Sequence, residues 1–161
     1  MRIVIGGVSG SGKTTIGKLL AEHLGYDFDD ADGFHPPENI AKMSAGIPLT
    51  DEDRASWLDA LGAYLKSHEN IVLACSALKK VYRDRLRELA GPVQFFVLTA
   101  PETVLKERLE EREHFMPPSL LASQLATLEL GEDVTVVSNA LPPEAVSAGI
   151  AASLLIDRRQ P

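Results

Sequence analysis

The chain has 161 residues, of which 45% are hydrophobic and 24% charged, a composition typical of one globular domain with a buried core. Its 16 lysines and arginines against 23 aspartates and glutamates give a formal net charge of -7, which excludes a general binder of nucleic acid or anionic membranes. The single cysteine, Cys75, excludes an internal disulfide framework, and no long apolar segment suggests a signal or a membrane span. We therefore expect a cytoplasmic protein with no nucleic-acid or membrane partner.

Short β-branched and aromatic runs alternate with longer helical patterns along the chain. The five strand candidates are residues 3–5, 26–30, 71–75, 94–98 and 134–137. The helix candidates are residues 13–24, 51–66, 79–90, 102–113, 119–130 and a last helix that begins at Pro142-Pro143. Apolar strands separated by helices indicate a parallel sheet covered on both faces. We find no repeat or long linker, so the pattern predicts one compact α/β unit spanning residues 1–161.

Local signals suggest where several helices begin and end. Thr50 or Asp51 can cap the helix over 51–66, and Ser119 can cap the one over 119–130. Gly91-Pro92 is a strong stop signal after residue 90. The last helix is expected to bury four apolar side chains: Val146, Ile150, Leu154 and Leu155.

The first strand candidate leads into a glycine-rich segment that contains the pattern G-x-x-x-x-G-K-[ST]. Gly7, Gly12, Lys13 and Thr14 occupy the fixed positions. Glycines let the backbone wrap closely around a phosphate, and amide groups at a helix N-terminus point at the anion. Lys13 adds a positive charge on the β- and γ-phosphates, and the Thr14 hydroxyl can bind Mg²⁺. The strand before the motif and the helix after it favour nucleotide binding over a purely structural turn.

A GTP-dependent switch is one alternative, because residues 30–33 spell D-x-x-G. This motif follows Lys13 too closely to leave room for a first switch loop and another strand. No N/T-K-x-D sequence is present to recognise guanine. The switch interpretation is therefore disfavoured.

Acidic residues surround the end of the second strand candidate: Asp27, Asp29, Asp30 and Asp32. Strand ends in an open parallel sheet face the ligand crevice. One carboxylate of the pair Asp30 and Asp32 can bind Mg²⁺, while the other orients and deprotonates an acceptor hydroxyl. The alternative is a solvated acidic turn.

Basic side chains occur in three further places that can complete such a site. His35 follows the acidic cluster, although a lone histidine there is more often a packing or capping residue. Lys79 and Arg83 are four residues apart, which predicts a shared helix face near the crevice or, alternatively, a solvated face. Arg108 and Arg112 precede a double proline, so they can belong to a mobile cover or to a charged helix end.

Together these segments resemble the gluconate kinase (gluconokinase) family of the nucleoside-monophosphate-kinase-like P-loop group. The matching stretches run in family order over about residues 5 to 130, and residues 75–79 (CSALK) and 114–117 (HFMP) are the most specific. The resemblance implies ATP-dependent phosphorylation of D-gluconate at its 6-hydroxyl, giving 6-phospho-D-gluconate and ADP with Mg²⁺. It also implies a three-layer P-loop kinase fold with a five-stranded parallel sheet, a small lid at about residues 108–120, and a homodimer.

The resemblance also assigns site residues by position. It makes Asp32 the base that orients the acceptor and places Lys13 and Arg112 on the transferring phosphates. The implied ATP-binding residues are Gly7, Val8, Ser9, Gly10, Ser11, Gly12, Lys13, Thr14, Thr15, Arg108 and Arg112. The implied acceptor-binding residues are Asp32, His35, Arg54, Lys79, Arg83 and His114. The implied Mg²⁺ ligands are Thr14 and Asp30.

Two departures and two rivals accompany this resemblance. Gly33 and residues 130–133 differ from the common family pattern, but neither belongs to the transfer machinery. A shikimate kinase would carry three glycines after the third strand, where this chain has residues 76–79 (SALK). An ATP-binding regulator without transfer activity would lack Lys13, Asp32 or the lid arginine, and all three are present.

Overall fold

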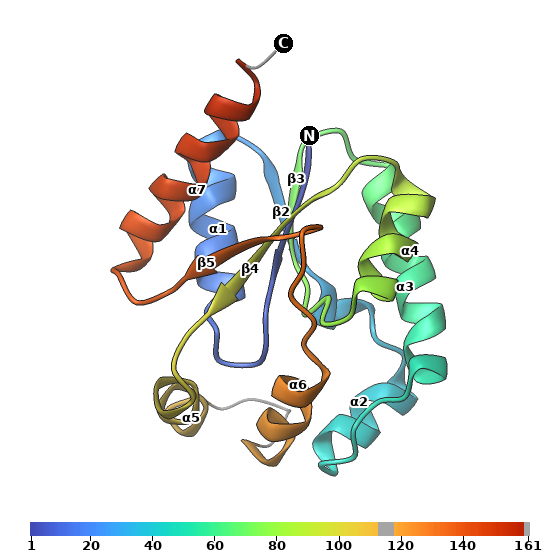
Figure 1. The fold of residues 1–161 in the computed structure, drawn as a ribbon. Coiled ribbons are helices and arrows are strands. Elements are labelled where there is room, and N and C mark those ends of the chain that lie inside the picture. The colour runs from blue at the N-terminus through green and yellow to red at the C-terminus, as the bar shows by residue number, and fades with distance from the viewer. Residues whose placement is uncertain (113–117, 160–161) are drawn as a thin grey trace.

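A five-stranded parallel sheet forms the centre of the computed structural model, which describes residues 1–112 and 118–159 (Figure 1). Its strands are β1 (Arg2–Gly6), β2 (Asp27–Asp30), β3 (Ile71–Ala74), β4 (Gln94–Thr99) and β5 (Thr135–Ser138). Their order across the sheet is β2-β3-β1-β4-β5. β1 is therefore central, with Ile3 opposite both Val72 of β3 and Gln94 of β4. The sheet and all five predicted strands are confirmed.

Two helices cover each face of the sheet, which makes the three layers that the sequence predicts (Figure 1). The helices are α1 (Lys13–Leu24), α2 (Pro37–Ser44), α3 (Asp51–Lys66), α4 (Lys80–Ala90), α5 (Glu102–Glu110), α6 (Leu121–Thr127) and α7 (Pro143–Asp157). α1 and α7 lie on one face, and α3 and α4 lie on the other. The shorter helices α2, α5 and α6 gather beyond the carboxyl ends of the strands.

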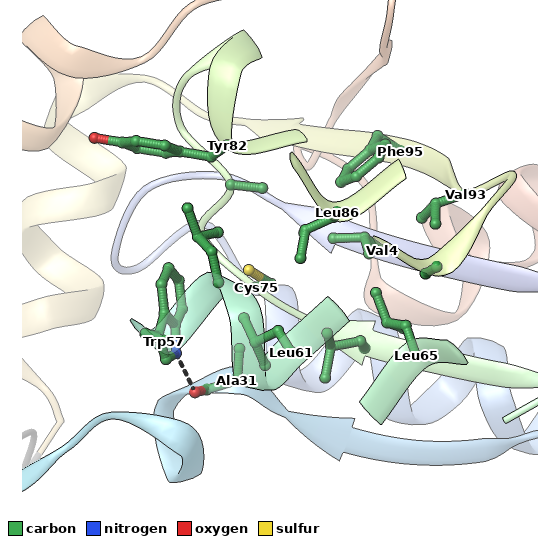
Figure 2. Packing of buried hydrophobic residues seen from close by; sticks show 14 of the residues in the cluster. Val4, Ala31, Trp57, Leu61, Leu65, Cys75, Tyr82, Leu86, Val93 and Phe95 are labelled. Carbon is green, nitrogen blue, oxygen red and sulfur yellow. Dashed lines mark hydrogen bonds between the residues drawn. The ribbon is translucent and has the colours of Figure 1, made fainter. Parts of the chain in front are cut away.

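Alternating side chains of the central strand supply both halves of the core. Val4 packs toward α3 and α4, whereas Ile3 and Ile5 pack toward α1 and α7. Figure 2 shows the first of these clusters, in which the indole nitrogen of Trp57 donates to the Ala31 carbonyl at 2.8 Å. This bond ties α3 to the turn after β2, the segment that carries Asp32. The core thereby fixes one edge of the site described below.

Some helix boundaries differ from the sequence-based prediction. Thr50 caps α3 through a reciprocal capping box with Asp53, as one of the two predicted caps. α5 ends at Glu110 rather than residue 113. Ser119 does not cap α6, because it lies inside a short 3₁₀ helix that leads into it. α6 ends at Thr127 because Leu128 takes an extended conformation.

Two further differences concern a helix that was not predicted and one side chain of the last helix. α2 was not predicted, because its eight residues begin at the second of two prolines and carry few apolar side chains. Leu155 is 55% exposed, since it lies one position around the helix from Leu154, which faces the core.

The predicted lid, residues 108–120, lies partly outside the described residues, so its role stays a prediction. Within residues 1–112 and 118–159, no helix is long and apolar enough to cross a membrane.

Candidate active site

The segment between β1 and α1 forms an anion cradle. Gly12 is the N-cap of α1 with φ of 95°, a left-handed conformation that favours glycine. A Cβ atom there would lie 2.4 Å from the Asn139 side-chain nitrogen. No described side chain caps α1, and its first turn carries no acidic residue, so the helix dipole favours an anion at this end. The buried Ser11 hydroxyl has no hydrogen-bond partner among the described residues, a further donor that a phosphate could satisfy.

Side chains from distant parts of the sequence hold this loop from outside. Asn139, directly after β5, donates to the Ser11 carbonyl at 2.7 Å. Arg108 of α5 donates to the Gly10 carbonyl at 3.1 Å and to the Asn139 carbonyl at 3.2 Å. The Gln124 side chain of α6 accepts from the Ser9 amide at 2.7 Å. Sequence reasoning missed Asn139 and Gln124, because a side chain that bonds to backbone over 100 residues away leaves no local motif.

Lys13 and two carboxylates meet at the ends of β1 and β2. The Lys13 ammonium donates to the Val8 carbonyl at 3.0 Å. Burial lowers the pKa of Lys13, and the nearby carboxylates of Asp32 and Asp30 oppose that shift. The Thr14 hydroxyl donates to one oxygen of Asp30 at 2.7 Å, and the other oxygen accepts from the Asp32 amide at 3.0 Å. Asp30 and Asp32 therefore lie close to Lys13 and to the Thr14 hydroxyl, and their separate roles stay a prediction.

The donor set suits Mg²⁺ held jointly with a phosphate ligand. The Thr14 hydroxyl and the Asp30 carboxylate are hard oxygen ligands, the type that Mg²⁺ prefers. No group of three or more His, Cys, Asp or Glu side chains among the described residues could hold a metal ion alone. Mg²⁺ commonly binds through one or two carboxylates plus substrate phosphates, so this sparse set fits.

A cavity of about 570 Å³ opens beside the cradle, within the usual size range of small-molecule sites. α2, α3 and α6 contribute lining residues that the sequence did not single out, among them Met43, Trp57, Ser123 and Thr127. The predicted site residues that line it are Ser9, Gly10, Gly12, Lys13, Thr14, Asp30, Asp32, His35, Arg54, Lys79 and Arg112.

A second hollow of about 310 Å³ lies on the other side of the cradle. Thr15 and Arg108 line it, and Gly12 and Arg112 line both hollows. The two spaces therefore meet at the N-terminus of α1. Val8 is instead buried in a small apolar cluster with Leu78. Some of the predicted loop residues thus line the cavity, whereas Thr15 lines the second hollow and Val8 packs in an apolar cluster.

One wall of the larger cavity is a chain of hydrogen-bonded polar side chains. Arg54 donates to the Leu49 carbonyl at 2.7 Å and to the Tyr82 hydroxyl at 3.0 Å. Tyr82 donates to Asp51 at 2.5 Å, and Lys79 pairs with the same carboxylate oxygen at 2.9 Å. The bonds from Tyr82 and Lys79 lower the pKa of Asp51. Tyr82 was not predicted as a site residue, because at helical spacing it reads as a core aromatic.

His35 sits against the core at the edge of this cavity. Its ring stacks on Trp57 with a centroid separation of 4.3 Å and an interplanar angle of 10°. Its Nδ1 atom lies 3.2 Å from the Asn39 side-chain nitrogen, so Nδ1 accepts and Nε2 carries the proton. Burial, with a smaller contribution from Arg54, lowers the pKa of His35 to about 4. At neutral pH it is an uncharged hydrogen-bond donor.

Arg83 does not lie where the sequence placed it. Its side chain is fully buried and bonds to Asp133 and to three backbone carbonyls, away from the cavity. The shared-face argument fails because Lys79 precedes α4 as its N-cap with an extended backbone, so helical spacing does not apply. His114 lies outside the described residues. Cys75 is buried, and burial raises the pKa of its thiol to about 12, which agrees with a residue that takes no part in chemistry.

Comparison with known proteins adds four findings. Residues 3–115 match a family model described as an AAA domain. The chain is 50% identical over 141 residues to a gluconokinase of Gluconobacter oxydans (strain 621H), covering 84% of this chain and 79% of that protein. A crystal structure of a gluconokinase from Sinorhizobium meliloti 1021 superposes with a TM-score of 0.82 at 49% identity, covering 97% of this chain and 96% of the other. A shikimate kinase from Aquifex aeolicus shares the fold, with a TM-score of 0.67 at 21% identity and 99% of each chain covered.

Proposed function

The chain belongs to the gluconokinase family, and from this premise we propose that it transfers the γ-phosphoryl group of ATP to the 6-hydroxyl of D-gluconate. The observation that carries the proposal is one cavity with two chemically distinct ends. One end has the phosphate loop with Lys13 and Thr14, and the other has the cations Arg54 and Lys79. Asp32 lines the same cavity, and its amide donates to the Asp30 carboxylate.

The nucleotide would span both hollows. Its phosphates fit the cradle at the N-terminus of α1, and its base and ribose fit the smaller hollow beside Arg108. Arg112 lines both hollows and would contact the phosphates between them. Thr14 and Asp30 would hold Mg²⁺, which when bound neutralises charge on the β- and γ-phosphates.

The acceptor would lie along the polar wall. Arg54 and Lys79 supply the positive charge that a carboxylate needs in a chain of net charge -7. Neutral His35 can donate a hydrogen bond to an acceptor hydroxyl. Asp32 would accept the proton of the 6-hydroxyl as that oxygen bonds to the γ-phosphorus and the bond to the bridging oxygen of ADP breaks. The products are 6-phospho-D-gluconate and ADP.

Three further features, which concern the chain as a whole, belong to the same proposal. We expect a single domain whose segment at about residues 108–120 closes over the nucleotide, a homodimer, and a cytoplasmic location. Closure would exclude water from the phosphoryl group and reduce ATP hydrolysis. Light scattering on the purified chain measures the mass in solution, and a monomer at all concentrations would overturn the dimer.

A coupled ADP-release assay tests the reaction. Mg-ATP is offered with gluconate, gluconic-acid epimers, shikimate, glucose or AMP as acceptor. We expect selective turnover of gluconate, with a product that 6-phosphogluconate dehydrogenase oxidises, which fixes the phosphorylated position. Turnover of another acid would overturn the substrate alone. ATP binding without turnover of any acceptor would favour a regulator.

A further inference from the structure

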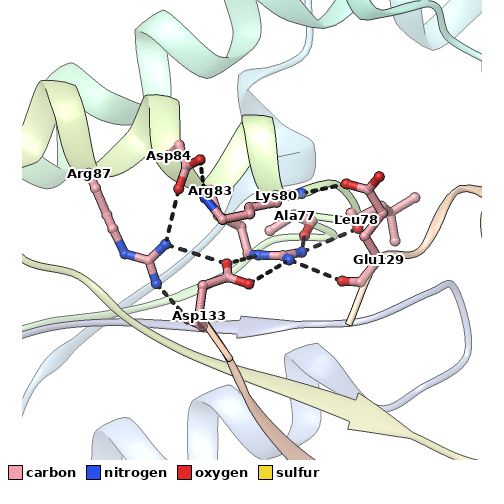
Figure 3. A network of polar contacts seen from close by, with 8 residues as sticks. All are labelled: Ala77, Leu78, Lys80, Arg83, Asp84, Arg87, Glu129 and Asp133. Atoms are coloured by element: carbon pink, nitrogen blue, oxygen red, sulfur yellow. Dashed lines mark hydrogen bonds and ion pairs between the residues drawn. The ribbon is translucent and has the colours of Figure 1, made fainter. Parts of the chain in front are cut away.

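Arg83 is the buried centre of a polar network that joins α4 to Glu129 and Asp133 (Figure 3). Its side chain is 0% exposed. Its Nε and Nη2 atoms donate to the two carboxylate oxygens of Asp133 at 2.7 and 3.2 Å, and Nη2 also donates to the Glu129 carbonyl at 3.0 Å. Nη1 donates to the carbonyls of Ala77 and Leu78 at 2.9 and 3.2 Å. These contacts use all five N–H groups of the guanidinium.

The network holds the loop between β3 and α4 against the segment that follows α6. Ala77 has a φ of 41°, an unfavourable left-handed conformation for alanine, and Arg83 binds its carbonyl. The Glu129 amide donates to the Leu78 carbonyl at 2.7 Å, and the Glu129 carboxylate accepts from the Lys80 amide at 2.9 Å. The loop is thus fixed on both sides. Its members Ser76, Leu78 and Lys79 line the large cavity.

We propose that Arg83 is a positioning residue: it fixes the loop over residues 76–79 and so holds Lys79 toward the acceptor carboxylate. This inference rests on the proposed function, in which Lys79 contacts that carboxylate. A planar guanidinium with every donor engaged sets the position of five acceptor atoms on four residues at once, whereas a lysine ammonium at the same place offers three donors from one point. Loss of this anchor would misplace Lys79 and weaken acceptor binding.

Arg87 provides a matched control on the same helix, one turn further along. It donates to the Asp133 carbonyl at 2.7 Å, and its guanidinium stacks over the Phe95 ring at 4.5 Å. It shares Asp133 with Arg83, but in the described parts of the chain it makes no hydrogen bond to Ala77 or Leu78. A role limited to anchoring Asp133 would therefore make the two arginines behave alike.

The test compares Arg83→Lys with Arg87→Lys in the full-length enzyme. We expect Arg83→Lys to raise KM for gluconate about tenfold or more, while KM for ATP stays within about twofold of wild type. Amide hydrogen exchange over residues 76–80 should accelerate in the same variant. Arg87→Lys should change neither quantity. Equal effects of the two variants, or a parallel rise of both KM values, would overturn the positioning role.

Two further variants keep the test decisive. Should Arg83→Lys fail to fold, Arg83→Met combined with Asp133→Leu removes both buried charges and is expected to fold with the same split in KM. Lys79→Ala should raise KM for gluconate, and adding Arg83→Lys should raise it no further. No effect of Lys79→Ala would overturn the role of Lys79 and this inference with it. An effect of Lys79→Ala without one of Arg83→Lys would overturn this inference alone.

Discussion

The two ends of the cavity are built from different parts of the polypeptide. The phosphate end is made largely of backbone, and Asn139, Arg108 and Gln124 hold that backbone from outside. The acceptor end is made of side chains, and its ion pair joins a partly exposed lysine to Asp51, whose side chain is 63% exposed. The triphosphate is the same in every kinase of this kind, so backbone amides in fixed positions can bind it. Acceptors differ between kinases, and side chains that can be substituted without disturbing the fold can distinguish them.

Lys13→Ala is expected to have the largest effect on catalysis and ATP binding at the phosphate end. We expect kcat/KM to fall about 10³-fold and ATP to bind more weakly, because the charge on the β- and γ-phosphates is lost. Steady-state kinetics and calorimetric titration with ATP measure the two effects. Lys18→Ala, an exposed lysine on the same helix, should leave both at wild-type values. Undiminished turnover of Lys13→Ala would contradict the assignment of the loop.

Asp32→Asn tests the junction between the two ends. We expect kcat to fall by about 10²-fold or more while ATP affinity is retained, because the amide cannot accept the hydroxyl proton. Single-turnover kinetics together with ATP titration separate the two quantities. Asp27→Asn changes an exposed carboxylate at the start of β2, the strand that precedes the segment with Asp32, and should have no effect. Wild-type turnover of Asp32→Asn would show that another group orients the acceptor.

Asn139→Ala tests whether ATP binding depends on the side chains that hold the phosphate loop from outside. We expect KM for ATP to rise about tenfold and KM for gluconate to change little, because the Ser11 carbonyl loses a buried hydrogen bond. Ser138→Ala, at the exposed neighbouring position, is the control. This result would mirror the Arg83 variant, which should affect the acceptor alone. A rise of both KM values would instead indicate that the two ends are coupled.

The smallest effect concerns the pH dependence of stability at the acceptor end. Burial lowers the pKa of His35 from 6.5 to about 4, so the unfolded chain takes up a proton before the folded chain does. Stability contributed by neutral His35 is therefore complete above pH 6.5 and is lost as the pH falls toward 4. We expect a loss of about 1 kcal/mol, reduced from the full shift because the ring is only half-buried. Urea unfolding at pH 7 and 4.5 should show this loss in wild type and not in His35→Asn.

Much of the fold follows from the sequence because its strands are unusually clear. The buried runs at β3 and β4 are apolar on both faces, and α1 and α3 begin and end at the predicted residues. α2 was missed because eight residues that begin at the second of two prolines give too short a pattern to recognise. The start of α6 was predicted two residues too early, because prolines mark a boundary without specifying whether an α-helix or a 3₁₀ helix follows.

The site residues also differ in whether a local sequence motif identifies them. The phosphate loop is a contiguous motif, so its residues could be named before the fold was known. Asn139 could not, because its partner Ser11 is brought to it only by the parallel pairing of β4 with β5. Arg83 was misassigned because a spacing of four residues describes a helix face, and the chain becomes helical only after Lys79.

The central position of β1 has a consequence for the order in which the molecule can form. The strand that carries the phosphate loop pairs with residues 71–74 on one side and 94–97 on the other, so both neighbours are available only after more than half of the chain has been made. Non-local pairing of this kind slows folding, because the entropy of loop closure is lost before the pairing contributes. During synthesis the nucleotide motif therefore precedes both strands that pair with β1. A chain truncated before β4 carries every residue of the motif but lacks the partner of residues 3–6, so we expect it not to bind a nucleotide.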